Sequence, residues 1–221
     1  MKRRFIQLIS LLAFFLLMGN SSFAHDSVID LEKMSKANTF WLYLKTGFEH
    51  IIPQGFDHIL FVLSLFLLSP KLKPVLLQAT AFTVAHTITL GLGMYNIVKI
   101  PSAIIEPLIA MSIIYVSIEN LFNRGLKKSR LGVVFLFGLV HGLGFAGSLQ
   151  GMGLPQNAFF VSLLTFNIGV ELGQVTVILL FYFLVAKWFT YKPYYRKAIV
   201  VPFSLMISLV AAFWTVERLI S

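Results

Sequence analysis

Long apolar runs separated by short polar connections make up most of the chain after residue 38. Six of these runs reach or approach the roughly 20 apolar residues that a transmembrane helix needs. They cover residues 56–69, 74–95, 103–122, 131–149, 158–187 and 198–219. The pattern predicts an all-α fold, a polytopic membrane helix bundle of about six transmembrane helices, which forms a single domain over residues 39–221.

The first run, over residues 56–69, is short for a complete span. It follows an amphipathic stretch over residues 39–52 that contains Trp41, an aromatic residue typical of the membrane interface. Pro53 and Gly55 separate the two stretches, and proline interrupts helical hydrogen bonding. We therefore predict a broken helix that begins at a membrane interface, bends near Pro53 and then crosses the bilayer.

The N-terminal segment has the three parts of a secretory signal peptide. Basic residues at positions 2–4 precede an apolar core over residues 5–18 and a small residue, Ala24, at the expected cleavage position. The prediction is a cleaved signal peptide over residues 1–24, followed by a short extracytoplasmic lead over residues 25–38. The apolar core is long, which leaves an uncleaved signal anchor as the alternative.

Composition supports the membrane assignment and narrows the chemistry. Hydrophobic residues make up 57% of the chain and charged residues 12%, whereas soluble domains contain about 45–50% and about 25%. The net charge of +9 comes from short clusters of Lys and Arg between apolar runs, so no nucleic acid partner is predicted. The chain has no cysteine, and any bound metal must therefore have nitrogen and oxygen ligands.

The basic clusters predict the orientation. The connections after the first, third and fifth runs carry ten basic residues, and those on the other side carry five. By the positive-inside rule, the more basic side is cytoplasmic. The expected location is therefore the bacterial inner membrane, as a multi-pass protein with its mature N-terminus and its C-terminus on the outer, periplasmic side. The ten residues are Lys71, Lys73, Arg124, Lys127, Lys128, Arg130, Lys187, Lys192, Arg196 and Lys197.

Acidic residues inside the predicted spans are the first candidates for function. A charged side chain at the centre of a membrane helix costs about 2.5–3.5 kcal/mol, so each calls for an explanation. Glu106 and Glu119 lie in the third span, 13 residues or about 220° apart around a helix, and are not expected to share a site. Both are candidate metal ligands. Alternatively, Glu119 together with Asn120 pairs with the nearby basic loop.

The segment GFEHIIPQGFDHILF, residues 47–61, is the richest in metal-ligand side chains. Glu49 and His50 precede the predicted break and Asp57 and His58 follow it, so a bend lets the two pairs converge. Two imidazoles and two carboxylates form a suitable capture site for Ni²⁺, Co²⁺ or Zn²⁺. The alternative is an interfacial helix whose polar residues face water.

Polar positions also recur at helical spacing in three later spans. They are Thr80, Thr83 and Thr87 beside His86, then His141 between Gly138 and Gly142, then Asn167, Glu171 and Gln174. The glycines form a small-xxx-small pair that lets a partner helix approach His141. We interpret His86, His141 and Glu171 as a mid-membrane metal site, with the other polar residues in support. The alternative is an interhelical hydrogen-bond network with neutral histidines and a protonated Glu171.

Cleavage after position 24 would make His25 the first residue of the mature chain. An N-terminal histidine can chelate a metal through its α-amino nitrogen and its imidazole. The amine has an ordinary pKa of about 7.7–8 and is partly deprotonated at neutral pH. His25 is therefore a further candidate ligand, and a disordered terminus without a role is the alternative.

Several of these segments together resemble the HupE/UreJ membrane proteins, a family associated with nickel uptake for hydrogenase and urease maturation. The resemblance covers nearly the whole mature chain and rests on GFEHIIPQGFDHILFVLSLFLL, AFTVAHTITL, IEPLIAMSIIYVSIENL, FGLVHGLGFAG and FNIGVELGQ. It implies that His50, Asp57 and His58 correspond to the family's histidine and Asp-His signature. It also implies that His86, His141 and Glu171 match the family's other intramembrane polar positions.

These features predict a carrier that moves a divalent transition metal, nickel or cobalt, into the cell. The ligands before and after the break would capture the ion, the mid-membrane residues would receive it, and Glu119 would pass it on. No prosthetic group is expected. The expected partners are the lipid bilayer, the metal ion, and a second copy of the chain or a metalloenzyme maturation protein. The alternatives are an intramembrane zinc-dependent hydrolase and a metal-binding accessory protein that does not transport.

Overall fold

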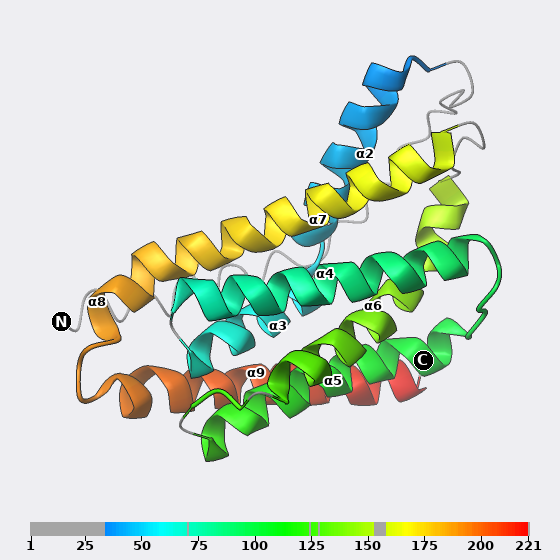
Figure 1. Cartoon of the computed structure of the whole chain (residues 1–221). Coiled ribbons are helices and arrows are strands. Elements are labelled where there is room, and N and C mark those ends of the chain that lie inside the picture. Colours follow the sequence, from blue (N-terminus) through cyan, green and yellow to red (C-terminus); the bar gives the residue numbers. More distant parts are fainter. Residues whose placement is uncertain (1–33, 70, 124, 128, 153–157, 221) are drawn as a thin grey trace. The chain divides into compact units, whose positions relative to one another are not determined.

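A computed structural model describes residues 34–69, 71–123, 125–127, 129–152 and 158–220. The predicted signal peptide and His25 lie outside these ranges. Within them every regular element is a helix, as the sequence predicts, and no strand occurs. The long helices are α2 (Lys36–Ile51), α3 (Phe56–Leu68), α4 (Leu72–Met94), α5 (Ser102–Phe122), α6 (Arg130–Met152), α7 (Phe159–Phe181) and α9 (Val201–Ile220) (Figure 1).

Five continuous helical segments of the described chain are long and apolar enough to cross a membrane. The segment that begins with α7 continues through a π-helical turn, η3 (Tyr182–Ala186), and α8 (Lys187–Phe189). The segment that ends with α9 begins with a second π-helical turn, η4 (Arg196–Val200). The pair α2 and α3 gives a sixth candidate span, bent by 66°. The all-α fold with about six spans and its broken first helix are therefore confirmed.

The bend between α2 and α3 follows from the local sequence. Helix α2 ends at Ile51, two residues before Pro53, which lacks the backbone N–H needed to continue the helix. Gly55 then precedes α3, and its N–H donates to the Ile51 carbonyl at 3.2 Å. A Cβ at Gly55 would collide with the His50 carbonyl. Glycine therefore permits the tight turn that brings the end of α2 and the start of α3 together.

The helices pack mainly as three pairs, α4 with α6, α2 with α7 and α5 with α9. Glycines make the first pair close. A Cβ at Gly138 would collide with the Phe82 carbonyl, and one at Gly142 with the His86 carbonyl. The predicted small-xxx-small pair thus faces the backbone of α4, and His141, between the two glycines, lies against the same helix beside Phe82. A matching close contact that we did not predict joins α2 and α7, where Gly47 lies against the Phe166 carbonyl.

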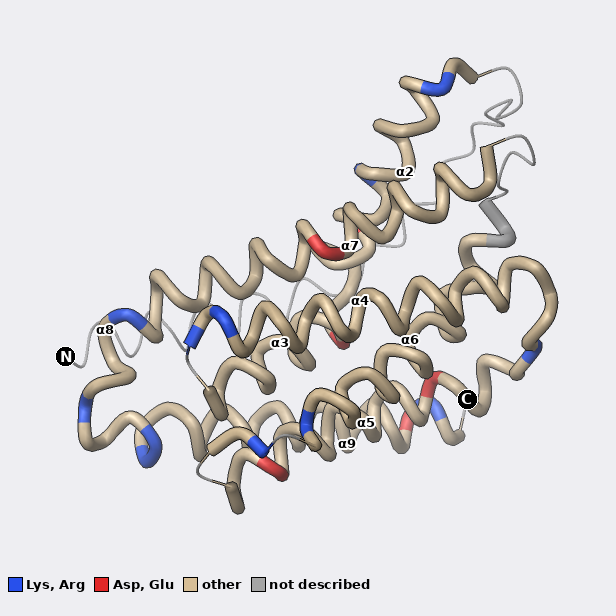
Figure 2. Tube along the Cα trace, viewed as in Figure 1, with Lys and Arg blue, Asp and Glu red and all other residues tan. Residues whose placement is uncertain are grey.

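Basic residues gather at one end of the bundle, where α8 lies (Figure 2). We call this the basic end, and it consists of the α3–α4, α5–α6 and α8–α9 connections. The described basic residues of these connections are Lys71, Lys73, Lys127, Lys187, Lys192, Arg196 and Lys197. The α2 N-terminus, the α4–α5 connection and the α9 C-terminus lie at the opposite end.

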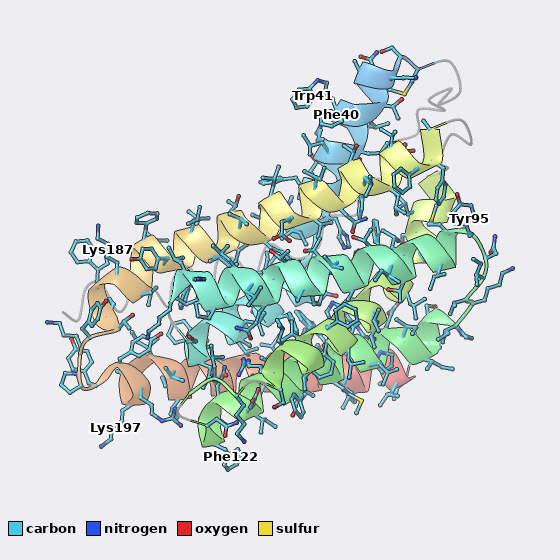
Figure 3. All side chains as sticks on the ribbon, viewed as in Figure 1. Phe40, Trp41, Tyr95, Phe122, Lys187 and Lys197 are labelled. Carbon is cyan, nitrogen blue, oxygen red and sulfur yellow. The ribbon has the colours of Figure 1, made fainter. Side chains whose placement is uncertain are left out.

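The sides of the helices expose large apolar side chains. Leu77 of α4, Leu136 of α6 and Leu172 of α7 are all exposed. Trp41 points away from the bundle at α2, and Phe122 does so at the end of α5 (Figure 3). Exposed apolar surface on this scale is unusual for a soluble protein and is the surface that contacts lipid in a membrane protein.

Candidate metal site

Three histidines from separate helices meet inside the bundle. His50 lies in the last turn of α2, His58 in the first turn of α3 and His86 in the middle of α4. One ring nitrogen of each lies within 4.8 Å of the other two. His58 and His86 are buried. We call these residues the three-histidine cluster. The bend between α2 and α3 is what brings His50 and His58 together.

His141, from α6, lies against this cluster. Its ring centroid is 5.0 Å from that of His58. The sequence analysis placed His50 and His58 at an outer capture site and His86 and His141 at a separate mid-membrane site. The structure instead brings all four together, because the broken helix carries the end of α2 into the bundle interior beside α4. Helix α6 reaches the same place through its glycine contacts with α4.

Each of the four histidines has one ring nitrogen that is buried and has no hydrogen-bond partner among the described residues. These atoms are the Nε2 of His50, His58 and His86 and the Nδ1 of His141. A buried polar atom without a partner costs about 1–3 kcal/mol, and such atoms are rare. Four such atoms in contacting side chains make this group of histidines the candidate ligand site.

The opposite ring nitrogens of His58 and His86 are anchored. His58 Nδ1 lies 3.1 Å from Asp57 Oδ1, and a carboxylate accepts, so Nδ1 donates the proton. His86 Nδ1 lies 3.1 Å from Asn167 Oδ1. Asn167 Nδ2 donates to the Leu163 carbonyl at 2.8 Å, which leaves the amide oxygen to face His86. Nδ1 is therefore the donor in both histidines, and in the neutral ring the lone pair then lies on Nε2.

In His141 the two ring nitrogens have the opposite roles: Nε2 is hydrogen-bonded and Nδ1 has no partner. The Ser112 hydroxyl donates to the Ile109 carbonyl at 2.7 Å, so its oxygen accepts from His141 Nε2, 3.0 Å away. The lone pair of His141 is then on Nδ1, the atom without a partner. Anchoring of the far nitrogen by a carboxylate, amide or hydroxyl is the usual arrangement around metal-binding histidines.

Phenyl rings enclose the site. The Phe145 ring centroid is 3.9 Å from that of His50, and the Phe82 centroid is 4.9 Å from that of His141. Phe166 stacks on Phe145 at 5.1 Å. These rings give the histidine nitrogens an apolar surrounding, and unprotonated imidazole nitrogens in such a surrounding could bind a metal ion.

Asp57 is the carboxylate closest to the histidines, and it acts on His58 through the anchoring bond. Its other oxygen lies 3.8 Å from Arg218 Nη2 of α9. The substitution Asp57→Asn is expected to weaken metal binding by about 10–100-fold, the usual cost of losing such an anchor. Titration calorimetry with Ni²⁺ checks this. Glu49→Gln is the matched control, because Glu49 lies 3.7 Å from Lys45 on the surface of α2. Equal affinities in the two variants would contradict the anchoring role.

The other predicted acidic ligands lie elsewhere. Glu49 pairs with Lys45, and Glu106 is exposed near the start of α5. Glu119 Oε2 accepts from Arg130 Nη1 at 2.9 Å, which is the alternative arrangement that the sequence left open. The described residues group none of these three acids with the three-histidine cluster.

Glu171 also stands apart from the histidines. It joins α7 to α4, with its two oxygens accepting from Thr80 Oγ1 at 2.7 Å and Thr83 Oγ1 at 2.5 Å. Because Thr83 precedes His86 by three residues in α4, this contact lies about one helical turn nearer the basic end. Of the remaining supporting residues, Thr87 donates to the Thr83 carbonyl at 2.7 Å, and the buried Gln174 side chain has no partner among the described residues.

The position of Glu171 gives a second prediction. Glu171→Gln is expected to leave the affinity for Ni²⁺ within about threefold of wild type, because the amide oxygen preserves one bond to the threonines and no cluster nitrogen is touched. The same calorimetric titration measures it. A loss of more than tenfold would place Glu171 among the ligands.

Sequence analysis did not single out two parts of the site. Ser112 anchors His141, but a serine in an apolar helix carries no signal of its own because it is compatible with lipid and with helix packing. The phenyl wall was also missed, because Phe is common throughout the chain, at 22 positions. Neither feature has a distinctive sequence spacing.

Residues 25–218 match the family model described as HupE / UreJ protein. Searches of curated proteins and of solved structures gave no match. The HupE/UreJ family consists of transport and accessory proteins rather than enzymes, so the alternative of a zinc hydrolase is not supported. With its membrane-spanning helices and a match over nearly its whole length, the chain belongs to the HupE/UreJ family of multi-pass membrane proteins related to nickel and cobalt transport.

Proposed function

We propose that this protein carries Ni²⁺ or Co²⁺ across the bacterial inner membrane and that the three-histidine cluster is the site at which the ion binds during transport. One observation supports this above all: four contacting histidines each hold a buried, unpartnered ring nitrogen. In three of them, the anchoring bonds leave the lone pair on that nitrogen. His50, His58 and His86 are the proposed ligands, and His141 is the fourth.

The donor set favours these ions over abundant hard cations. Imidazole suits Ni²⁺, Co²⁺ and Zn²⁺, whereas Mg²⁺, Ca²⁺ and Mn²⁺ prefer oxygen. Three ligands around one ion at about 2.0–2.1 Å lie about 3.4 Å apart in a tetrahedral arrangement. The cluster nitrogens lie within 4.8 Å of one another, so small shifts of the rings would bring them to this spacing. Moderate affinity suits a site that must also release its ion.

Orientation follows from charge. We place the basic end in the cytoplasm by the positive-inside rule, with both ends of the mature chain on the periplasmic side. His86 lies eight residues before Met94, the last residue of α4, or about 12 Å along the helix from the periplasmic end. An ion from outside would therefore reach the cluster about a third of the way through the bundle.

Uptake into proteoliposomes tests this function. Purified protein should carry Ni²⁺ and Co²⁺ at rates well above those of protein-free vesicles, with Mn²⁺ much slower because its preferred ligands are oxygen atoms. His86→Ala, tested in parallel, should reduce the flux to the level of protein-free vesicles. If none of the ions crossed while the protein still bound them, the chain would be an accessory metal binder and the carrier proposal would fail.

A further inference from the structure

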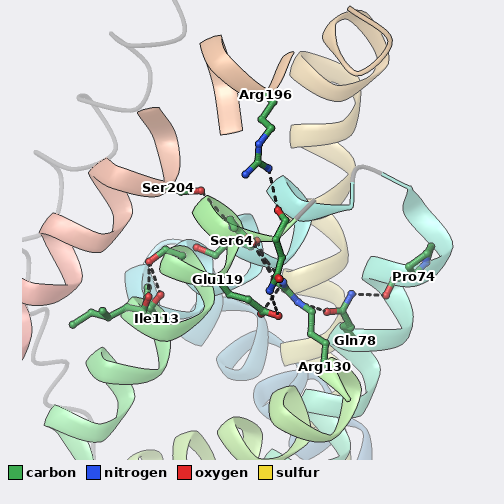
Figure 4. Close-up of polar contacts among 12 residues, drawn as sticks. Ser64, Pro74, Gln78, Ile113, Glu119, Arg130, Arg196 and Ser204 are labelled. Atoms are coloured by element: carbon green, nitrogen blue, oxygen red, sulfur yellow. Dashed lines mark hydrogen bonds and ion pairs between the residues drawn. The ribbon is translucent and has the colours of Figure 1, made fainter. Parts of the chain in front are cut away.

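Arg130 is buried near the basic end and surrounded by oxygen atoms (Figure 4). It begins α6 and was counted with the basic loop residues in the sequence analysis, yet only 3% of it is exposed. Its Nη1 donates to Glu119 Oε2 at 2.9 Å and its Nε to Gln78 Oε1 at 3.1 Å. Longer contacts of 3.5 Å reach Asn120 Oδ1 and the Ser64 carbonyl. We call these four oxygen-bearing residues the oxygen cage.

The amide oxygens of the cage are held in place. Gln78 Nε2 donates to the Pro74 carbonyl at 2.9 Å, and Asn120 Nδ2 donates to the Ser64 carbonyl at 2.8 Å. Their oxygens are thereby left to face the guanidinium. One carboxylate, two amide oxygens and a backbone carbonyl are also the groups that bind metal cations through oxygen. The cage is therefore a cation site that the tethered charge of Arg130 occupies.

This cage belongs to the same helices as the histidines. Ser64 follows His58 by six residues in α3, and Gln78 precedes His86 by eight in α4. At 1.5 Å per residue, the cage lies about 9–12 Å from the cluster toward the basic end. Arg130 itself precedes His141 in α6. An ion that travels between these helices from the cluster to the basic end therefore meets the guanidinium.

Beyond the cage lies a surface groove of about 530 Å³. Glu119 lines both: one oxygen accepts from Arg130, and the other accepts from Asn123 Nδ2 at 3.2 Å. Asn123 and Lys127 line its polar end, and the rest of its lining is largely apolar side chains of α5 from Met111 to Phe122. The Glu119 carboxylate thus connects the buried cage with the surface at the basic end.

We propose that Arg130 is the gate of the metal route at the basic end: its guanidinium fills the oxygen cage, and the ion passes only when the guanidinium leaves. The inference rests on the proposed transport function. In the closed arrangement seen here, the tethered positive charge both occupies the oxygen ligands and repels a divalent cation. When Arg130 leaves, the same oxygens, with Glu119 foremost, are available to the ion on its way to the basic end.

Flux through Arg130→Ala in proteoliposomes tests the gate. The variant should carry Ni²⁺ at least about fivefold faster than wild type, because its cage holds no tethered cation. Methylguanidinium on both sides of the membrane should then slow the variant toward the wild-type rate and leave wild type unchanged, since it can refill only an empty cage. Arg196→Ala is the matched control at the same end, because Arg196 donates to the backbone carbonyls of Leu121 and Asn123 outside the cage.

The outcomes separate the two proposals. Absence of wild-type flux would overturn the transport function itself. Wild-type flux, with an Arg130→Ala flux that is not raised and does not respond to methylguanidinium, would overturn the gate alone. Nickel binding with wild-type affinity shows that the variant is folded. If Arg130→Ala does not bind nickel, Arg130→Gln, which keeps hydrogen-bond donors but not the charge, is judged by the same two measurements.

Discussion

His58→Ala is expected to weaken the binding of Ni²⁺ or Co²⁺ by more than about 100-fold, beyond the range seen when only an anchoring residue is lost. His58 is central to the site. Its ring centroid lies 4.7 Å from that of His50, 5.9 Å from that of His86 and 5.0 Å from that of His141. Removing it takes away one ligand and leaves a gap between the others, which are held by three different helices.

Titration calorimetry of the detergent-solubilised protein measures this loss. Glu106→Gln is a suitable control, because it removes an acid that lies exposed near the start of α5, and its affinity should stay within about twofold of wild type. A dissociation constant for His58→Ala within about threefold of wild type would mean that the ion binds elsewhere.

Gly142→Ala is expected to destabilise the protein by about 2–3 kcal/mol, which corresponds to a fall in melting temperature of about 5–10 °C. The added Cβ would collide with the His86 carbonyl and with Thr89 Oγ1. The first of these is backbone and cannot rotate away, so α4 and α6 must separate. Because the separation moves His141 of α6 relative to the histidine cluster, nickel affinity should also fall by about tenfold or more.

Gly147→Ala in the same helix provides the matched control. A Cβ at Gly147 meets nothing within 4 Å, so the melting temperature and the nickel affinity should both stay close to wild type. Thermal unfolding followed by intrinsic fluorescence compares the two variants. Equal melting temperatures would show that the close contact between α4 and α6 does not contribute to stability.

The fold could be predicted because each membrane-spanning helix is a long apolar run in the sequence. Lipid-facing and buried positions are both apolar, so the runs stand out, and the break at Pro53 and Gly55 is local chemistry. The glycine pair around His141 likewise predicted a close helix partner. Which helix would be that partner could not be predicted, because small residues favour close approach without specifying against what.

The arrangement of the site was less accessible to sequence reasoning. If the first span were straight, His50 would lie near the membrane surface and His86 deeper in the membrane. The 66° bend instead carries His50 into the interior beside His86. The burial of Arg130 could not be predicted either. At the edge of an apolar run, a basic residue predicts a loop, and its burial depends on Gln78 and Glu119, which lie 52 and 11 residues away in sequence.

X-ray absorption spectroscopy of the nickel-loaded or cobalt-loaded protein tests the central claim most directly. The proposed site predicts a first shell with three or four nitrogen ligands and the outer-shell scattering of imidazole rings, with one imidazole fewer in His58→Ala. A first shell of oxygen atoms alone, without imidazole scattering, would contradict the assignment of the metal to the histidines.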